Sequence, residues 1–339
     1  MYNTIDFYVA CFVLLIIILP LVLIFTGNDS INTYGKKANN PILEMEVLEM
    51  SGVDSKTIPR GIKYAHVSRL WDLGYKGQGI KVGIIDSGVA VDHKEFSHNA
   101  VYKRNKIPDN FNGTNIHGTH VAGTIGAQGL KIIGAAPLCT VYDYRIFGNE
   151  DSKGKAAKLS GDVGLLIGAL DQAYNDGCHI VNLSLGIPVD YAPIRNAIHK
   201  AYNKGMTVVA AAGNRERKSD NKSYPAMYDT VISVGALKID GDKISKAAFS
   251  MDNSKVDVWA HGHRVLSTLP QQKYGFLSGT SMAAPLVTGA ISSYFSQLVE
   301  TGEKPSPQKA AQFLKENSNK MSSNTRVLKL KGVEVEWTE

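Results

Sequence analysis

Short apolar runs alternate with amphipathic stretches through the middle of this 339-residue chain. Continuous apolar runs, which are typical of buried parallel strands, lie near residues 80–88, 140–147, 180–186 and 206–214. Between them, apolar residues recur at helical spacing over 163–174 and 194–202. This alternation predicts an α/β fold with a mainly parallel sheet and helices on both of its faces.

Helix start and stop signals flank the two amphipathic stretches. Ser160 can cap the first helix, and Gly177 stops it. Its predicted apolar face consists of Val163, Leu166, Ile167, Leu170 and Tyr174. Gly205 stops the second helix. Two further helices, rich in small residues, are expected to begin at His117 and just after Gly279.

The N-terminal apolar run, residues 7–25, contains no charged residue and is about 19 residues long, enough to cross a bilayer. No Lys or Arg precedes this run, whereas Lys36 and Lys37 follow it. A clear positive N-region and a small-residue cleavage site are both missing. The interpretation is a membrane-spanning or signal-anchor segment over residues 1–26, so the predicted location is a single-pass membrane protein. A cleaved signal followed by secretion is the alternative, and a buried helix is a third.

Composition changes mark the remaining boundaries. Residues 27–54 are mostly polar and too few to fold alone, which indicates a linker or short pro-segment. The mixture of apolar and polar residues typical of a packed domain covers residues 55–325. Residues 326–339 are interpreted as a C-terminal tail. We expect residues 40–54 to act as a short inhibitory or docking segment.

Charge and cysteine content exclude some classes of function. The net charge of +6 is modest, and the basic residues are scattered along the chain, so no nucleic-acid partner is expected. Only Cys11, Cys139 and Cys178 occur, without metal-ligand spacing, and buried free thiols are the ordinary interpretation.

Polar residues follow several of the predicted buried strands. Asp86, Ser184 and Asn214 each lie at the carboxyl end of a strand, where parallel sheets place ligand-binding and catalytic groups. His117 and Ser281 each open a small-residue helix. Each has an ordinary structural interpretation, such as a turn carboxylate or a helix cap. His117 and His120 also resemble a metal pair, but no third ligand is apparent.

Taken together, Asp86, His117 and Ser281 form the set that acyl transfer requires. A serine hydroxyl is a poor nucleophile unless an imidazole accepts its proton, and a buried carboxylate must orient that imidazole. The side-chain amide of Asn214 can donate a hydrogen bond to a developing oxyanion.

Three sequence blocks make the chain resemble the subtilisin-like serine proteases. They are Ile85-Asp86-Ser87-Gly88, His117 to Gly123, and Gly279-Thr280-Ser281-Met282-Ala283-Ala284-Pro285. Shorter matches around Asn182, Asn214 and Tyr224 extend the resemblance over about residues 58–320. The resemblance implies a three-layer α/β/α fold with about seven mainly parallel strands, endopeptidase activity on protein or peptide substrates, and a structural role for His120. It also implies that Ser184, Leu185 and Gly186 pair with the substrate backbone and that Ser223 lines the pocket.

The chain departs from this family at several positions. The family's strong calcium site uses a loop after the histidine helix, but residues 128–134 contain no carboxylate, and Lys131 adds a positive charge. That site is therefore expected to be lost. Glu95 alone makes a weak case for calcium, and no cofactor is predicted. Ile187 and Ser223 replace common glycines and should narrow the pocket or make it more polar.

Two other classes of function compete with a membrane-anchored endopeptidase. One is a catalytically silent relative that serves as a binding module. The other is a dinucleotide enzyme, but Gly77 and Gly79 precede the strand instead of following it, so the phosphate-binding fingerprint is missing. A serine endopeptidase is the prediction, with the silent module as its alternative.

Overall fold

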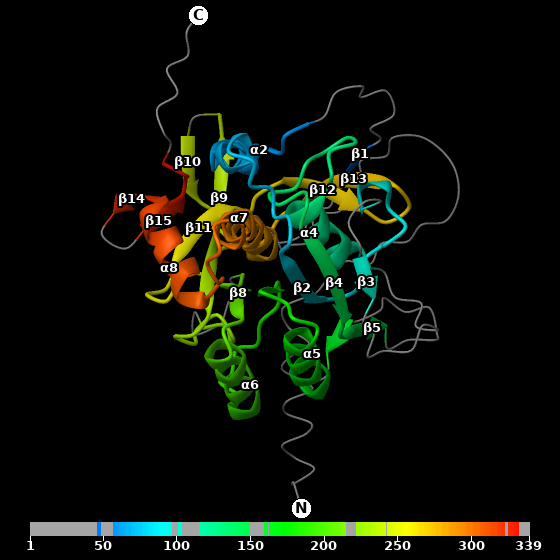
Figure 1. Ribbon diagram of the computed structural model, residues 1–339, viewed down its shortest axis with the longest axis vertical. Coiled ribbons are helices and arrows are strands. Elements are labelled where there is room, and N and C mark those ends of the chain that lie inside the picture. The colour runs from blue at the N-terminus through cyan, green and yellow to red at the C-terminus, as the bar shows by residue number, and fades with distance from the viewer. Residues whose placement is uncertain are drawn as a thin grey trace, which may run out of the picture.

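A parallel sheet lies at the centre of the computed structural model (Figure 1). In order across the sheet, the strands are β14 (Ser318–Ser322), β15 (Thr325–Leu328), β11 (Val258–His261), β9 (Ile232–Asp240), β8 (Thr207–Ala211), β7 (Ile180–Leu183), β2 (Lys81–Asp86), β4 (Thr140–Arg145) and β3 (Val101–Lys103). Every pairing from β15 to β3 is parallel. The sheet has 10 strands where about seven were expected, in part because β14 and β10 (Lys243–Lys246) add antiparallel strands to β15 and β9.

Helices cover both faces of this sheet, as buried parallel strands require. Helices α5 (Val163–Asn175) and α6 (Ala192–Asn203) pack on one face around a core that includes Leu166 and Ile198. The other face carries α2 (Arg60–Tyr64), α3 (Ser68–Asp72), α4 (Ile116–Gly126), α7 (Thr280–Glu300) and α8 (Pro307–Glu316). The predicted three-layer α/β/α architecture is confirmed.

The predicted helices lie close to the observed ones, but the cap assigned to Ser160 is wrong. Leu166 and Leu170 of α5 are buried, and Val163, Ile167 and Tyr174 pack against the same core. Ser160, however, does not cap this helix. It lies in β6 (Leu159–Gly161), which pairs antiparallel with β5 (Phe147–Asn149), while the helix begins at Val163. The backbone of Ser160 therefore pairs with Gly148 in a β-ladder, and the helix starts three residues later.

A small second sheet lies beside the central one. It consists of β1 (Glu46–Leu48), β13 (Lys273–Leu277) and β12 (Val265–Leu269), all antiparallel. Strand β1 belongs to the predicted linker or pro-segment. Residues 46–48 are the part of that segment that the structure describes. It docks on β13, the strand that runs directly into the start of α7.

The predicted C-terminal tail is wrong at its start. Residues 325–328 form β15, whose Val327 pairs with Trp259 of β11 and is buried. Further along, the backbone N–H of Leu330 donates to the carbonyl of Ala65, and Arg69 donates to the carbonyl of Leu330. The domain therefore extends at least to Leu330, because these hydrogen bonds attach Leu330 to the end of α2 and to α3.

The structure describes residues 46–48, 57–96, 101–103, 115–149, 159–161, 163–214, 222–241, 243–322 and 325–331. Within these ranges, no helix combines the length and the apolar composition that crossing a membrane requires. The predicted anchor at residues 7–25 and most of the segment 40–54 lie outside the described residues.

Candidate active site

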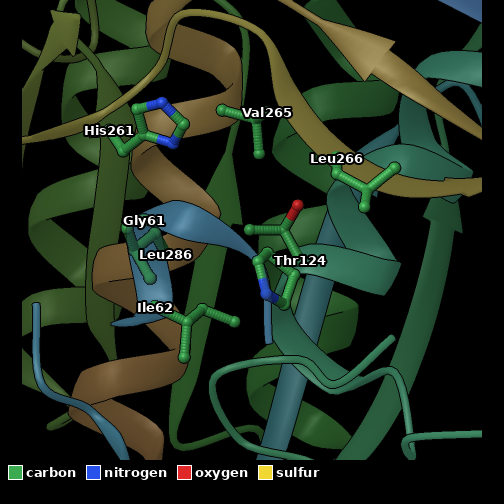
Figure 2. Close-up of a pocket in the computed structure, with 8 residues that line it drawn as sticks. Gly61, Ile62, Thr124, His261, Val265, Leu266 and Leu286 are labelled. Atoms are coloured by element: carbon green, nitrogen blue, oxygen red, sulfur yellow. The ribbon is translucent and has the colours of Figure 1, made fainter. Parts of the chain in front are cut away.

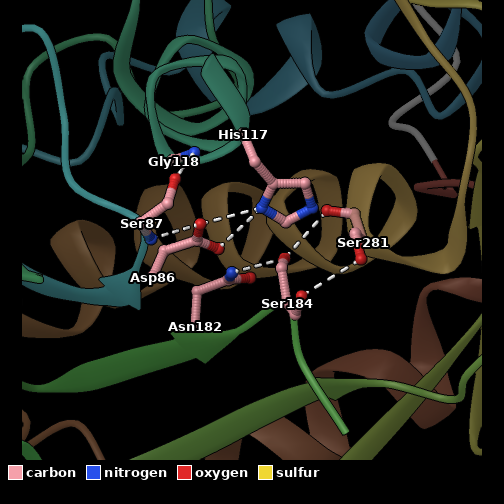
Figure 3. Close-up of polar contacts among 7 residues, drawn as sticks. All are labelled: Asp86, Ser87, His117, Gly118, Asn182, Ser184 and Ser281. Carbon is pink, nitrogen blue, oxygen red and sulfur yellow. Dashed lines mark hydrogen bonds and ion pairs between the residues drawn. The ribbon is translucent and has the colours of Figure 1, made fainter. Parts of the chain in front are cut away.

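Asp86 and His117 meet at the carboxyl edge of the sheet (Figure 3). Asp86 ends β2 and His117 lies in the first turn of α4, and the imidazole Nδ1 lies 2.8 Å and 3.0 Å from the two carboxylate oxygens. The close approach depends on Gly118, because a Cβ there would lie 2.3 Å from the carbonyl oxygen of Gly88. The N–H of Gly118 also donates to Oγ of Ser87. The absence of a side chain at Gly118 lets the start of α4 reach the loop that follows β2.

The charge of Asp86 controls the protonation of His117. Burial alone would lower the pKa of His117, but the negative charge of Asp86 and its hydrogen bond outweigh burial and raise it. Asp86 is itself buried, and its Oδ1 accepts a further hydrogen bond from the N–H of Ser87 at 2.6 Å. This geometry fixes the proton on Nδ1 of His117 and leaves Nε2 as the basic nitrogen.

His120, one turn later, is bound to the backbone of β12. Its Nε2 donates to the carbonyl of Val265 at 2.8 Å, and burial lowers its pKa to about 3. No cluster of three or more His, Cys, Asp or Glu side chains suited to a metal occurs in the described part of the chain. A neutral His120 thus connects α4 to β12.

Ser281 lies in the first turn of α7, directly after Gly279 and Thr280. Its Oγ donates to the carbonyl of Ser184 at 3.1 Å, and Oγ of Ser184 donates to the carbonyl of Ser281 at 2.8 Å (Figure 3). Among the described residues, no hydrogen bond joins Ser281 to His117. The structure therefore connects Asp86 to His117 and Ser281 to Ser184. Contacts between an apo nucleophile and its base are often formed only when substrate binds.

Asn214 follows β8 and is held by the residue that precedes Ser281. Its Oδ1 accepts hydrogen bonds from the N–H and the Oγ1 of Thr280, at 3.0 Å and 3.1 Å. Oγ1 of Thr280 in turn accepts from the N–H of Gly213. With Oδ1 engaged in this way, the N–H groups of the Asn214 amide are the part of the side chain left for a ligand.

The segment Ser184-Leu185-Gly186 leaves β7 and runs beside Ser223. A Cβ on Gly186 would lie 2.1 Å from Oγ of Ser223, and one on Gly213 would lie 2.8 Å from the Ser223 Cβ. Ser223 is fully buried, and no described residue hydrogen-bonds to its Oγ. Next to Gly186, Ile187 exchanges two backbone hydrogen bonds with Tyr224. These bonds hold the segment that follows β7 against the segment that contains Ser223. The predicted substrate-binding residues Gly186 and Ser223 thus lie in direct contact.

Sequence reasoning did not assign a role to Asn182, although it is buried below this site. Its Nδ2 donates to Oγ of Ser184 at 2.8 Å, and its Oδ1 accepts from Oγ1 of Thr288 on α7. Asn182 therefore connects the helix of Ser281 to the strand of Ser184. A polar residue inside an otherwise apolar buried strand was the available signal, because such a group needs a specific partner.

A small hollow lies between α2, α4, α7, β11 and β12 (Figure 2). Ile62, Thr124, Val265 and Leu286 line it together with His261, and it has room for about one water molecule. No described group hydrogen-bonds to either ring nitrogen of His261. Burial, together with the charges of Arg60 and His263, lowers the pKa of His261 to about 4. His261 is therefore a neutral, buried imidazole.

Known proteins resemble this chain over most of its length. A model described as the subtilase family matches residues 77–330. The major intracellular serine protease of Bacillus subtilis is 35% identical over 250 residues, covering 70% of this chain and 75% of that protein. Subtilisin DY of Bacillus licheniformis is 36% identical over 249 residues, covering 72% and 86%. An intracellular serine protease of Paenibacillus polymyxa is 33% identical over 286 residues, covering 79% and 84%.

The family match and the named relatives define the class of this protein as a hydrolase of the serine type. The chain belongs to the subtilase family, and it is a subtilisin-like serine endopeptidase. Proteins and peptides are accordingly its class of substrate.

Proposed function

We propose that this protein cleaves peptide bonds through Asp86, His117 and Ser281, with an acyl-enzyme intermediate on Ser281. The observation that carries the proposal is the buried Asp86–His117 pair at the sheet edge to which α7 also brings Ser281. A carboxylate buried against Nδ1 of an imidazole supports proton transfer at Nε2. Ser281, at the N-terminus of a 21-residue helix, has the positive end of the helix dipole behind it.

In the proposed first step, Oγ of Ser281 leaves the carbonyl of Ser184 and turns to Nε2 of His117. An N–H of the substrate backbone takes its place on that carbonyl, as strand addition along Ser184, Leu185 and Gly186 requires. Nε2 accepts the hydroxyl proton as Oγ attacks the peptide carbonyl carbon. Asp86 stabilises the imidazolium that forms, and the Asn214 amide donates to the oxyanion.

Collapse of the tetrahedral intermediate breaks the C–N bond, and His117 delivers its proton to the leaving amine. A water molecule then attacks the acyl ester, with His117 again accepting a proton, and its return to Oγ regenerates Ser281. Ser223 supports a narrow pocket for the side chain that precedes the cleaved bond, because its Oγ fills the space between Gly186 and Gly213.

Labelling with a serine-reactive phosphonyl fluoride tests the assignment of Ser281. The wild-type chain should be labelled and lose peptidase activity, whereas Ser281→Ala should be inactive and unlabelled. Ser292→Ala is the matched control, since Ser292 is buried on the same helix and donates to the carbonyl of Thr288. A folded wild-type protein that neither reacts nor cleaves peptides would instead support the silent binding module.

We also propose that residues 7–25 anchor the enzyme in a membrane, a proposal that rests on their apolar sequence. The protein should stay with membranes after alkaline carbonate washing, and a variant lacking residues 1–26 should be released. N-terminal sequencing of the native protein distinguishes the alternatives. A start at Met1 or Tyr2 supports the anchor, a start shortly after residue 25 indicates a cleaved signal, and a start near residue 55 indicates self-release.

A further inference from the structure

Four consecutive backbone N–H groups in the loop that follows α4 converge on one buried carboxylate. The N–H groups of Gly129 and Leu130 donate to Oε2 of Glu95 at 2.9 Å and 3.0 Å. Those of Lys131 and Ile132 donate to Oε1 at 2.7 Å and 3.0 Å. The Glu95 side chain belongs to η1 (Lys94–Phe96), and the residue is 0% exposed. Successive N–H groups aimed at one point form an anion-binding concavity.

A fifth donor comes from the hairpin that leads into α7. The hydroxyl of Tyr274, on β13, donates to Oε1 of Glu95 at 3.1 Å. Burial and the charge of Glu95 raise the pKa of Tyr274, so its hydroxyl keeps the proton that it donates. Tyr274 also pairs with Leu48 of β1 through the strand ladder. The carboxylate thus connects the loop to the sheet on which β1 docks.

The same loop also binds the N-terminal edge of the peptidase domain, at Thr57, through backbone hydrogen bonds. The N–H of Thr57 donates to the carbonyl of Lys131 at 2.7 Å, and the N–H of Ile133 donates to the carbonyl of Thr57 at 3.2 Å. The backbone carbonyl of Glu95 accepts from the N–H of Gln128 as well. Three segments distant in the sequence therefore meet around Glu95. They are the N-terminal edge of the domain at Thr57, the loop after α4, and the β12–β13 hairpin.

This donor set does not fit calcium, which the resemblance led us to consider at this loop. Calcium takes several oxygen ligands, often carboxylates and carbonyls. Here the loop points N–H groups inward, and both carboxylate oxygens of Glu95 already accept hydrogen bonds, Oε1 three and Oε2 two. The partial positive charge of the N–H groups favours an anion and opposes a cation at the same point.

We propose that these four N–H groups form an anion site whose resident ligand is the Glu95 side chain. An internal carboxylate, in place of a bound cation, fastens the loop, the hairpin and the N-terminal edge together. A buried carboxylate is stable only when its charge is met by donors, and the donors in turn are costly to leave unpaired in the interior. Removal of the carboxylate should therefore leave a vacant site with a preference for small anions.

Chemical rescue tests this proposal, best in the Ser281→Ala background so that self-cleavage does not obscure stability. Glu95→Ala should lower Tm by about 10 °C, because it leaves buried donors without an acceptor. Acetate or formate should recover a substantial part of this loss in a saturable way, while calcium chloride should not. Glu316→Ala is the control, since Glu316 is exposed and accepts from Gln312, and its Tm should respond to acetate as the parent does.

Two further measurements decide the matter even if Glu95→Ala does not fold. The Tm of the parent chain should be unchanged by a calcium chelator and by added calcium. Tyr274→Phe, which removes one of five donors, should keep the fold with a smaller loss of Tm. A parent Tm that falls with chelator and returns with calcium would overturn the proposal. So would a Glu95→Ala variant that folds with the parent's Tm, or one rescued by calcium and not by acetate. These readouts measure stability, so they are independent of the catalytic assignment.

Discussion

Ser184 and Ser281 exchange two hydrogen bonds: Oγ of Ser281 donates to the carbonyl of Ser184, and Oγ of Ser184 donates to the carbonyl of Ser281. The residue proposed as nucleophile is thereby held against the segment proposed to receive the substrate backbone. Occupation of the Ser184 carbonyl by substrate would free Oγ of Ser281 for His117. In the proposed mechanism, substrate binding and activation of the nucleophile are therefore coupled through these two residues.

The link from Asn182 through Ser184 to Ser281 should contribute to turnover. Ser184→Ala removes two neutral hydrogen bonds, the one that Oγ accepts from Asn182 and the one that it donates to the carbonyl of Ser281. We expect kcat/KM on a peptide substrate to fall about 5- to 10-fold. Asn182→Ala should cost about as much, since it also removes two bonds, and Thr288 keeps the carbonyl of Ala284 as an acceptor. In the double variant the two losses should not add, because both interrupt the same chain of bonds. Additive losses, or an equal loss in Ser292→Ala, would mean that the chain of bonds is not specific to the site.

Asp86→Asn should lower kcat by about three to four orders of magnitude while the protein remains folded. The asparagine keeps the shape but no longer stabilises a charged imidazole or fixes the proton on Nδ1 of His117. The measurement is steady-state hydrolysis of a peptide substrate, with circular dichroism to show that the fold persists. A variant that keeps most of its activity would remove Asp86 from the proposed mechanism.

The pH dependence of the reaction should show the influence of Asp86 on His117. Since His117 must be neutral to accept a proton and its pKa is raised, kcat/KM of the wild type should increase as pH rises through a value above 6.5. Asp86→Asn removes the charge that raises this pKa, so its residual activity should begin to rise at lower pH. An acid limb at the same pH in both proteins would show that a different group controls the rate.

Gly186 and Ser223 should compensate for each other. Gly186→Ala places a Cβ 2.1 Å from Oγ of Ser223, so we expect a loss of about 1–3 kcal/mol in stability and a lower kcat/KM. Ser223→Ala removes the atom in conflict, so the double variant should recover most of the stability. Urea unfolding and peptide hydrolysis measure the two effects. If the double variant is no better than Gly186→Ala, another neighbour limits the space.

His261 should make the fold sensitive to mild acid. Its pKa in the folded state is about 4, against about 6.5 when unfolded. Above pH 6.5 it is neutral in both states and has no effect on stability. As pH falls towards 4, the unfolded state takes up the proton first, and roughly 2–4 kcal/mol of stability is lost. His120 adds a loss of the same sign.

His261→Leu isolates this contribution, since the hollow is lined by Ile62, Val265 and Leu286 and accepts an apolar side chain. The free energy of unfolding, measured in urea between pH 7 and pH 4, should fall less steeply in the variant than in the wild type. Equal slopes in the two proteins would show that His261 is already protonated, or hydrated, in the folded state.

The sequence by itself determined the layer architecture, because the periods of its apolar residues separate buried strands from amphipathic helices. It also indicated Asp86, His117, Ser281 and Asn214, because polar groups at strand ends and helix starts stand out against apolar runs. Ser160 was misread because a cap signal is local, and the pairing of its strand with residues 147–149 is not. Strand β15 was missed for the same reason, since a short strand is defined by its neighbour.

Only the tertiary structure decided how these residues are connected. The family resemblance made Glu95 a weak candidate for calcium, but the N–H groups of residues 129–132 point at its carboxylate, which is an anion. The bonds between Ser184 and Ser281, and the role of Asn182 between them, likewise depend on side chains 97 and 106 residues apart. Residue type determines which groups are able to bond. Whether they do depends on distance and direction, which the folded chain alone sets.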